Sequence, residues 1–378
     1  MPPYLAGRQE EQEEFSRLLD QHVVLENAIL TGLRGVGKTV LLEIFKPLAQ
    51  RKKWLWVGTD LSESASVTES TLATRLLTDV AVVASSFETL SESESGTIEQ
   101  PLDYDFLLQQ CDLTPGLISD KLKSMLEIVH AHMPKKYAGI IFAYDEAQNL
   151  SDHAVVNEYP LSVLLEVFQS IQRKGIPFML LLTGLPTLFP KLVEARTYAE
   201  RMFRVLFLTQ LSDSESDEAI RMPMDVSSCA IRFTEESIEL IKNVSGGYPY
   251  FIQFICREVF DLFLQQYVLL DRAPQVQMSA ILKKLDSDFF AGRWARATDR
   301  QRDLLSVAAM LEDHSEFSVK DIVESSKVRQ DVKGFSSSHS SQMLATLADT
   351  GLIYKNRYGK YSFAVPLLAE FIRRQSLR

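Results

Sequence analysis

The chain has 378 residues, of which 46% are hydrophobic and 24% charged, and its formal net charge at pH 7 is −10. This composition is that of a globular protein with two or three domains, and the three cysteines, which lack metal-ligand spacing, exclude a disulfide scaffold and a zinc site. The first residues lack the features of a signal peptide and no apolar run approaches the ~20 residues of a membrane span, so we expect a cytoplasmic protein without membrane contact.

The first 211 residues alternate short apolar runs with segments of helical periodicity. A continuous apolar run indicates a strand that is buried on both faces, as in a parallel sheet. Strands are predicted at 27–31, 54–60, 139–144, 178–184 and 205–208, and helices at about 5–21, 40–45, 68–84, 118–133, 161–174 and 187–202. This alternation predicts an α/β fold, a three-layer sandwich around a parallel sheet, for a first domain of residues 1–211.

One stretch of this domain breaks the pattern. Residues 85–96 are rich in serine and glutamate, a composition that buries little apolar surface and is typical of mobile chain. We therefore interpret residues 85–116 as a mobile insertion within the first domain and not as a boundary between domains.

The rest of the chain is mainly helical by pattern. Helices at 215–222 (capped by Ser212), 234–244 and 250–267 predict a helical domain over 212–295. After it, helices are predicted at 299–311, 318–325 and 338–350, then a hairpin of strands 352–354 and 361–365, then a helix that begins at Pro366. Three helices and a hairpin are the element order of a winged-helix domain, here residues 296–378.

The segment 32–39, Gly-Leu-Arg-Gly-Val-Gly-Lys-Thr, lies between a predicted strand and a predicted helix. It matches the phosphate-binding loop, in which glycines let backbone N–H groups surround a phosphate chain at a helix N-terminus. Lys38 is expected to reach the β- and γ-phosphates of ATP, and Thr39 to ligate Mg²⁺. The predicted nucleotide contacts are Gly32, Leu33, Arg34, Gly35, Val36, Gly37, Lys38, Thr39 and Val40. The alternative is a glycine-rich turn that binds no ligand.

Two carboxylates end the apolar run at 139–144. Asp145 stands where the end of a parallel strand would bring it beside Thr39, so we predict that it binds Mg²⁺ directly or through a coordinated water. Glu146 points in another direction and is predicted to polarise the attacking water. Thr183, at the polar end of the strand 178–184, is the candidate that holds this water or the γ-phosphate. The alternatives are an ordinary Asp-Glu turn and a threonine that only ends a strand.

Negative charge develops on the γ-phosphoryl oxygens during hydrolysis, and an arginine often stabilises it. Arg196, Arg201 and Arg204 are the candidates. We choose Arg201, because the predicted end of a helix before the last strand is a position exposed at a subunit edge. The alternative for each is an arginine that only stabilises a helix C-terminus.

Together the motifs resemble bacterial AAA+ ATPases of the origin-recognition and STAND-like group, in which a phosphate-loop domain is followed by a helical lid and a winged helix. Residues 32–39 are similar to Walker A and residues 140–146 to Walker B. Residues 183–186 and 198–201 resemble the sensor-1 strand and the helix that follows it. The resemblance covers nearly the whole chain apart from the stretch 85–116.

The same resemblance implies further contacts with the nucleotide. Gly7 and Arg8 belong to a segment similar to the N-terminal box that surrounds adenine, and Pro249 ends a Gly-Gly-Tyr-Pro run similar to the lid motif whose proline lies against the nucleotide. Many members of the group place a sensor-2 arginine in the lid, whereas this lid helix has no arginine before Arg257. This departure favours a slow nucleotide switch over fast turnover in a ring.

Three functions follow as hypotheses. The first is an ATP-binding and ATP-hydrolysing switch that uses Mg²⁺, forms homo-oligomers with ATP and couples nucleotide state to an unknown protein partner. The second is a DNA-binding ATPase, a loader or transposition-type regulator, in which residues 336–342 enter a major groove while Arg357 and Lys360 contact phosphate. The third is a nucleotide-regulated interaction module with a vestigial ATPase. The complete Walker motifs argue against the third, and the absence of Arg and Lys from 334–342 weakens the second.

Overall fold

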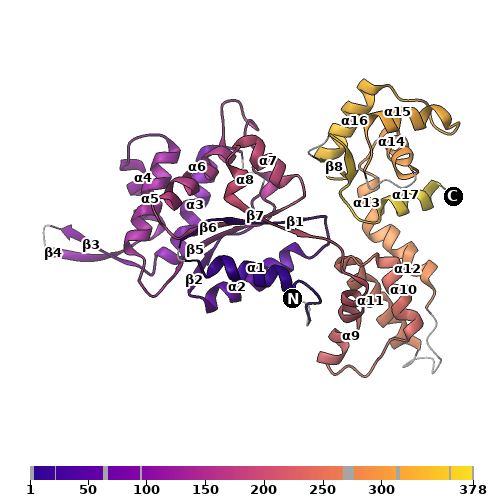
Figure 1. Cartoon of the computed structure of the whole chain (residues 1–378), viewed down its shortest axis with the longest axis horizontal. Helices are drawn as coiled ribbons and strands as arrows, with labels where there is room; N and C mark the ends of the chain where they lie inside the picture. Colours follow the sequence, from indigo (N-terminus) through magenta and orange to yellow (C-terminus); the bar gives the residue numbers. More distant parts are fainter. Residues whose placement is uncertain are drawn as a thin grey trace. The chain divides into compact units, whose positions relative to one another are not determined.

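Figure 1 shows a computed structural model of the chain, which describes residues 4–21, 23–62, 67–93, 96–266, 276–311, 316–356 and 359–376. The contacts within the chain divide it into two compact units. The first, the sheet unit, consists of Arg8–Thr31 and Lys38–Phe207. The second, the helical unit, consists of Met1–Gly7, Gly32–Gly37 and Leu208–Arg378.

A five-stranded sheet forms the centre of the sheet unit. Its strands are β1 (Asn27–Gly32), β2 (Trp54–Val57), β5 (Gly139–Tyr144), β6 (Phe178–Gly184) and β7 (Phe203–Leu208), in the order β2-β5-β6-β1-β7. Strand β5 pairs in parallel with β2 and β6, and β6 pairs in parallel with β1. Every residue of β1, β5 and β6 is buried, as expected for a parallel sheet that is covered on both faces. The predicted α/β fold with a parallel sheet is confirmed.

Helices cover both faces of this sheet. Figure 1 shows α1 (Gln9–Leu19) and α2 (Lys38–Arg51) on one face, and α3 (Glu69–Ala84), α5 (Ile118–His132) and α6 (Pro160–Arg173) on the other. Because side chains alternate along a strand, Ile140, Phe142 and Tyr144 of β5 enter the same hydrophobic core as α3, α5 and α6. Under the opposite face, Phe15 of α1 stacks on Phe45 of α2 with 4.1 Å between the ring centroids.

The stretch 85–116, interpreted from its composition as a mobile insertion, contains regular secondary structure that the composition did not predict. Its regular elements are an antiparallel hairpin of β3 (Glu88–Ser93) and β4 (Gly96–Pro101) and the helix α4 (Tyr104–Leu113). Two fully buried side chains, Phe87 and Leu102, flank the hairpin. Asp103 caps α4, because its carboxylate accepts the N–H of Phe106 at 2.9 Å. The prediction rested on the serine- and glutamate-rich composition of residues 85–96. Phe87 lies near the start of that segment, and Leu102 and Asp103 lie after it, so its composition did not indicate them.

The helix predicted at 187–202 is in fact two short helices, α7 (Leu188–Ala195) and α8 (Ala199–Met202). The break occurs at Arg196, whose backbone is extended, with φ −146° and ψ 114°. This conformation ends the ladder of helical hydrogen bonds, and the chain restarts a helix at Ala199 just before β7.

The helical unit begins, after β7, with three helices. They are α9 (Asp213–Val226), α10 (Glu235–Ser245) and α11 (Pro249–Leu264). Ser212 caps α9 in a capping box with Glu215, and Pro249 takes the first position of α11, where its missing N–H costs nothing. Ile220, Ile238 and Ile252, one from each helix, belong to one buried core.

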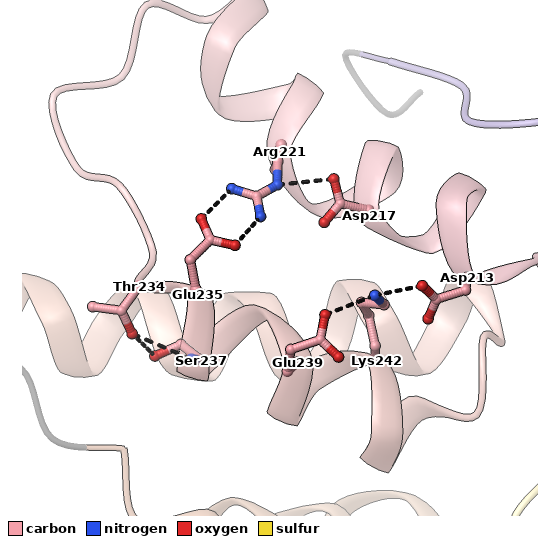
Figure 2. Close-up of polar contacts among 8 residues, drawn as sticks. All are labelled: Asp213, Asp217, Arg221, Thr234, Glu235, Ser237, Glu239 and Lys242. Carbon is pink, nitrogen blue, oxygen red and sulfur yellow. Dashed lines mark hydrogen bonds and ion pairs between the residues drawn. The ribbon is translucent and has the colours of Figure 1, made fainter.

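An ion-pair network lies on the surface of α9 and α10 (Figure 2). Each of its two cations contacts two carboxylates: Arg221 contacts Asp217 and Glu235, and Lys242 contacts Asp213 and Glu239. The guanidinium of Arg221 meets both carboxylate oxygens of Glu235, and this contact lowers the pKa of Glu235.

The last part of the helical unit forms a second core. Its elements are α12 (Met278–Leu285), the π-helical turn η4 (Asp286–Phe290), α13 (Ala291–Trp294), α14 (Asp299–Ala309), α15 (Val319–Val328), α16 (Ser337–Asp349), β8 (Ile353–Lys355), β9 (Tyr361–Phe363) and α17 (Leu368–Ser376). The predicted succession of three helices and an antiparallel hairpin occurs as α14, α15, α16 and β8–β9. The last helix begins at Leu368 and not at Pro366, because Leu367 has a left-handed backbone with φ +59°.

Three elements before α14 were not predicted, namely α12, η4 and α13. Arg357, one of the two cations expected to contact DNA phosphate, lies outside the described residues. Within the part of the chain that the structure describes, no helix is long and apolar enough to cross a membrane.

Candidate functional site

The predicted phosphate-binding loop connects β1 to α2, and its residues 32–37 belong to the helical unit, whereas Lys38 and Thr39 belong to the sheet unit. Gly35 and Gly37 have φ of +81° and +95°, backbone conformations that residues with a side chain rarely adopt. Lys38 is the first residue of α2, so the loop leads directly into a helix N-terminus. Such an N-terminus offers unpaired N–H groups and partial positive charge to an anion.

Thr39 and Asp145 meet within the sheet unit. The hydroxyl of Thr39, in the first turn of α2, donates to Oδ2 of Asp145 at 2.7 Å. Asp145 follows β5 and is buried, and its Oδ1 accepts the N–H of Glu146 at 2.8 Å. The backbone carbonyl of Asp145 also accepts the N–H of Leu61 at 2.9 Å, which fixes the strand end. The structure thus brings together the two residues predicted as Mg²⁺ ligands.

Glu146 is exposed and has a left-handed backbone, with φ 52° and ψ 32°. This conformation is uncommon for a residue with a long side chain. The carboxylate of Glu146 accepts a hydrogen bond from the side-chain amide of Gln148. The two carboxylates thus have different partners, Thr39 and the N–H of Glu146 for Asp145 and the amide of Gln148 for Glu146.

Thr183 is fully buried at the end of β6, and its hydroxyl has no hydrogen-bond partner among the described residues. Thr31, the last residue of β1 before Gly32, is buried in the same condition. An unpartnered buried hydroxyl is unfavourable, so both positions suit a polar ligand or water. Sequence reasoning missed Thr31, although its place directly before the glycine-rich loop could have drawn attention to it.

Of the residues predicted to lie near the nucleotide at its adenine and lid sides, Gly7 and Pro249 belong to the helical unit and Arg8 to the sheet unit. Gly7 has φ +64° and packs against Glu215 of α9 in the helical unit. Arg8 belongs to the sheet unit, where it forms an ion pair with Glu11 at 3.4 Å. Within the helical unit, the N–H of Tyr250 donates to the carbonyl of Gly35 at 3.1 Å. Since Tyr250 directly follows Pro249, the first turn of α11 contacts the loop.

The three candidate arginines differ in their partners. Arg204 forms ion pairs with Glu14 at 3.2 Å and Glu26 at 3.6 Å, so its charge is already used within the sheet unit. Arg196 lies close to Tyr198, where burial raises the pKa of the phenol and the charge of Arg196 opposes that rise. Arg201, in α8, is exposed and forms no ion pair with any described residue. Among the residues that the structure describes, Arg201 therefore differs from Arg204 in having no carboxylate paired with it.

The donor set fits a magnesium nucleotide better than a protein-held metal. No cluster of three or more His, Cys, Asp or Glu side chains that could hold a metal occurs among the described residues. The hydroxyl of Thr39 and the carboxylate of Asp145 are the hard oxygen ligands that Mg²⁺ accepts, and Mg²⁺ usually takes its other ligands from water and phosphate.

Residues 287–372 match a family model described as a domain of unknown function (DUF8462). No curated protein matches the chain. Among solved structures, the chain is similar to the Walker-type ATPase PABY2304 of Pyrococcus abyssi, with 17% identity, a TM-score of 0.59 and coverage of 97% of this chain and 95% of that one. It is also similar to the ORC2 protein of Aeropyrum pernix in its ADP form, with 14% identity, a TM-score of 0.56 and coverage of 100% and 97%. The chain has the fold of origin-recognition-type AAA+ ATPases.

This fold confirms the resemblance drawn from the motifs. At these identities it establishes the architecture, and the roles of individual residues in this chain follow only from their own geometry.

Proposed function

We propose that the chain binds ATP with Mg²⁺, hydrolyses it slowly and uses the nucleotide state as a switch. The observation that carries this proposal is the 2.7 Å contact between Thr39 and Asp145, directly after a glycine loop that enters a helix N-terminus. A turn without a ligand would not need a hydroxyl and a buried carboxylate from segments 106 residues apart to converge at that point. The A. pernix ORC2 structure in its ADP form supports the choice of an adenine nucleotide.

In this proposal, the backbone N–H groups of residues 32–39 surround the phosphates, and the ammonium of Lys38 contacts the β- and γ-phosphates. Thr39 and Asp145 hold Mg²⁺, which supplies positive charge to the phosphate oxygens when it is bound. Glu146 orients a water and accepts its proton, for which an exposed carboxylate without a paired cation is suited. The hydroxyl of Thr183, which lies near the end of β6 and has no hydrogen-bond partner among the described residues, is proposed to bind this water or the γ-phosphate.

The switch itself is assigned to the contact between the loop and the first turn of α11. The hydrogen bond from Tyr250 to Gly35 links the loop to the helix that Pro249 begins. A nucleotide that changes the loop would bias this contact and, through α11, the position of the lid helices. We further propose three domains, residues 1–211, 212–295 and 296–378. After residue 211, one core consists mainly of residues 211–281, and a second consists mainly of residues 297–372 but also includes Phe251, Leu285 and Phe290, so the proposed boundary at 295 crosses a shared core.

The DNA-binding alternative gains little from the structure. Arg300 packs over the ring of Phe335 and donates to the carbonyls of Lys333 and Gly334, in the turn before α16. It therefore supports the turn before α16, and its guanidinium is not presented to a phosphate. We keep an ATP-dependent homo-oligomer and an unidentified protein partner as the proposed assemblies.

The proposal is tested by phosphate release from ATP in the presence of Mg²⁺, with wild-type protein and Glu146→Gln purified identically. We expect the wild-type protein to hydrolyse ATP and the variant to release phosphate at least about 100-fold more slowly. The ATP affinity of the variant, measured by calorimetry, should be unchanged, because only the proton acceptor is lost. Failure of wild-type protein to bind ATP would contradict the proposal. Equal turnover in both proteins would move the catalytic role away from Glu146.

A further inference from the structure

Gln148 connects the end of β5 to the end of β6 through both ends of its side chain. It lies in the 3₁₀ turn η2 (Ala147–Asn149) directly after Glu146. Its Nε2 donates to Oε2 of Glu146, and its Oε1 accepts the N–H of Leu185 at 3.2 Å. Leu185 comes two residues after Thr183, at the end of β6.

These two contacts fix which way the amide faces. The N–H of Leu185 can only donate, so the oxygen of Gln148 must face it. The NH₂ group must then face Glu146, whose ionised carboxylate can only accept. A hydrogen bond from an amide to a charged carboxylate is stronger than one between neutral groups, so the arrangement has a single favoured orientation.

Two further contacts hold Gln148 in place. The ammonium of Lys191, in α7, donates to the backbone carbonyl of Gln148 at 2.7 Å. Burial lowers the pKa of Lys191, and the charges of Asp152 and Glu194 oppose this effect. Gly184 leaves the space for the amide, because a Cβ at that position would lie 2.6 Å from Oε1 of Gln148.

We propose that Gln148 is a positioning residue for Glu146, and this inference rests on the proposed function. Gln148 holds Oε2 of Glu146 and leaves Oε1 to accept a proton from water. The same amide ties the direction of the Glu146 carboxylate to the end of β6. A movement of Thr183 and Leu185 would therefore reorient the proton acceptor.

The first test compares Gln148→Met with Asn149→Ala. Methionine keeps the length of the side chain but cannot donate to Glu146, so we expect kcat to fall about 10- to 100-fold while KM and the ATP affinity stay within about twofold. Asn149 is the matched control, because it lies in the same turn but its side-chain amide donates to the carbonyl of Leu61 at 2.9 Å and not to Glu146. Asn149→Ala is expected to keep kcat within about twofold.

A second variant reaches the same contact from the other strand. Gly184→Ala places a methyl group 2.6 Å from Oε1 of Gln148 and 2.9 Å from Cδ2 of Leu188, and because it displaces the amide we expect it to lower kcat as Gln148→Met does. Wild-type kcat in both variants would overturn the inference.

A readout without nucleotide completes the test. In the nucleotide-free protein, Glu146→Ala is expected to shift the side-chain amide resonances of Gln148 by NMR, while Asn149→Ala leaves them in place. An unchanged Gln148 signal in Glu146→Ala would overturn the inference. Loss of turnover in Glu146→Gln together with normal turnover in Gln148→Met would overturn the inference on Gln148 and leave the proposed role of Glu146 standing. Normal turnover in Glu146→Gln would overturn the proposed role of Glu146 as well.

Discussion

The carboxylates after β5 have uncharged hydrogen-bond partners, whereas those of α9 and α10, the helices of the proposed lid, have cationic partners. In the lid, Asp217 and Glu235 share Arg221, and the remaining two carboxylates of Figure 2 share Lys242. After β5, Asp145 and Glu146 accept hydrogen bonds from a hydroxyl, a backbone N–H and an amide. Neither of these two carboxylates forms an ion pair with any residue that the structure describes.

This difference separates carboxylates that serve the fold from carboxylates that can serve a ligand. The lid pairs lie at the surface, where solvent and salt screen them and their effect on stability is small. Asp145 is buried and its hydrogen-bond partners, Thr39 and the N–H of Glu146, are uncharged, so in the proposed function its negative charge would be balanced by Mg²⁺. The comparison therefore predicts that substitutions after β5 change ligand binding, whereas substitutions in the ion pairs of α9 and α10 change only the stability of the fold.

The largest effect on nucleotide binding is expected for Lys38→Ala. Loss of the ammonium at the start of α2 removes the proposed contact with the β- and γ-phosphates, so ATP affinity by calorimetry should fall by at least about 100-fold. Lys242→Ala is the matched control, because that lysine pairs with Asp213 and Glu239 in the lid. An ATP affinity of Lys38→Ala equal to that of the wild-type protein would show that the loop is not part of the ATP-binding site.

A large effect on turnover alone is expected for Arg201→Ala, about 1,000-fold, if Arg201 completes the site of a neighbouring subunit. Mixing inactive Arg201→Ala with inactive Glu146→Gln should then restore part of the activity, because one of the shared sites has both groups. Arg204→Ala serves as a control, since Arg204 is paired with Glu14 and Glu26. If the two inactive proteins associate and no mixing ratio restores activity, Arg201 acts only within its own helix.

The smallest effect is expected in the lid. Because Arg221 lowers the pKa of Glu235 in the folded chain, the pair stabilises the fold above the pKa of the unfolded chain, and this stability is lost as the pH falls through the folded pKa. Glu235→Gln should lower Tm by at most about 2 °C at pH 7 and by nothing measurable near pH 2. ATP affinity should not change. A Tm difference that persists unchanged at the lower pH would contradict the charge-based explanation.

The sequence predicted the sheet because its strands carry the evidence locally. The strands β1, β5 and β6 are continuous apolar runs, and the glycine loop and the pair Asp145–Glu146 follow two of them directly. Caps such as Ser212 are equally local, and the helix that it caps was predicted to begin within a few residues of its observed start.

What the sequence did not predict depends on contacts between distant residues. The side-chain oxygen of Gln148 accepts the N–H of Leu185, which is 37 residues away in the sequence, and no local sequence pattern predicts this hydrogen bond. The hairpin β3–β4 lies in a segment whose composition resembles mobile chain, yet Phe87 and Leu102 at its edges are buried in the core. The left-handed backbone of Leu367, which delays α17, likewise has no signature in residue type.

The central claim is that Asp145 is reserved for a nucleotide-bound cation, and Mn²⁺ in place of Mg²⁺ tests it most directly. Mn²⁺ binding in the presence of ATP is measured by electron paramagnetic resonance for wild-type protein, Asp145→Asn and the lid variant Asp217→Asn. We expect Asp145→Asn to weaken Mn²⁺ binding by about 10- to 100-fold and Asp217→Asn to leave it unchanged. Equal Mn²⁺ affinity in Asp145→Asn and wild-type protein would contradict the account.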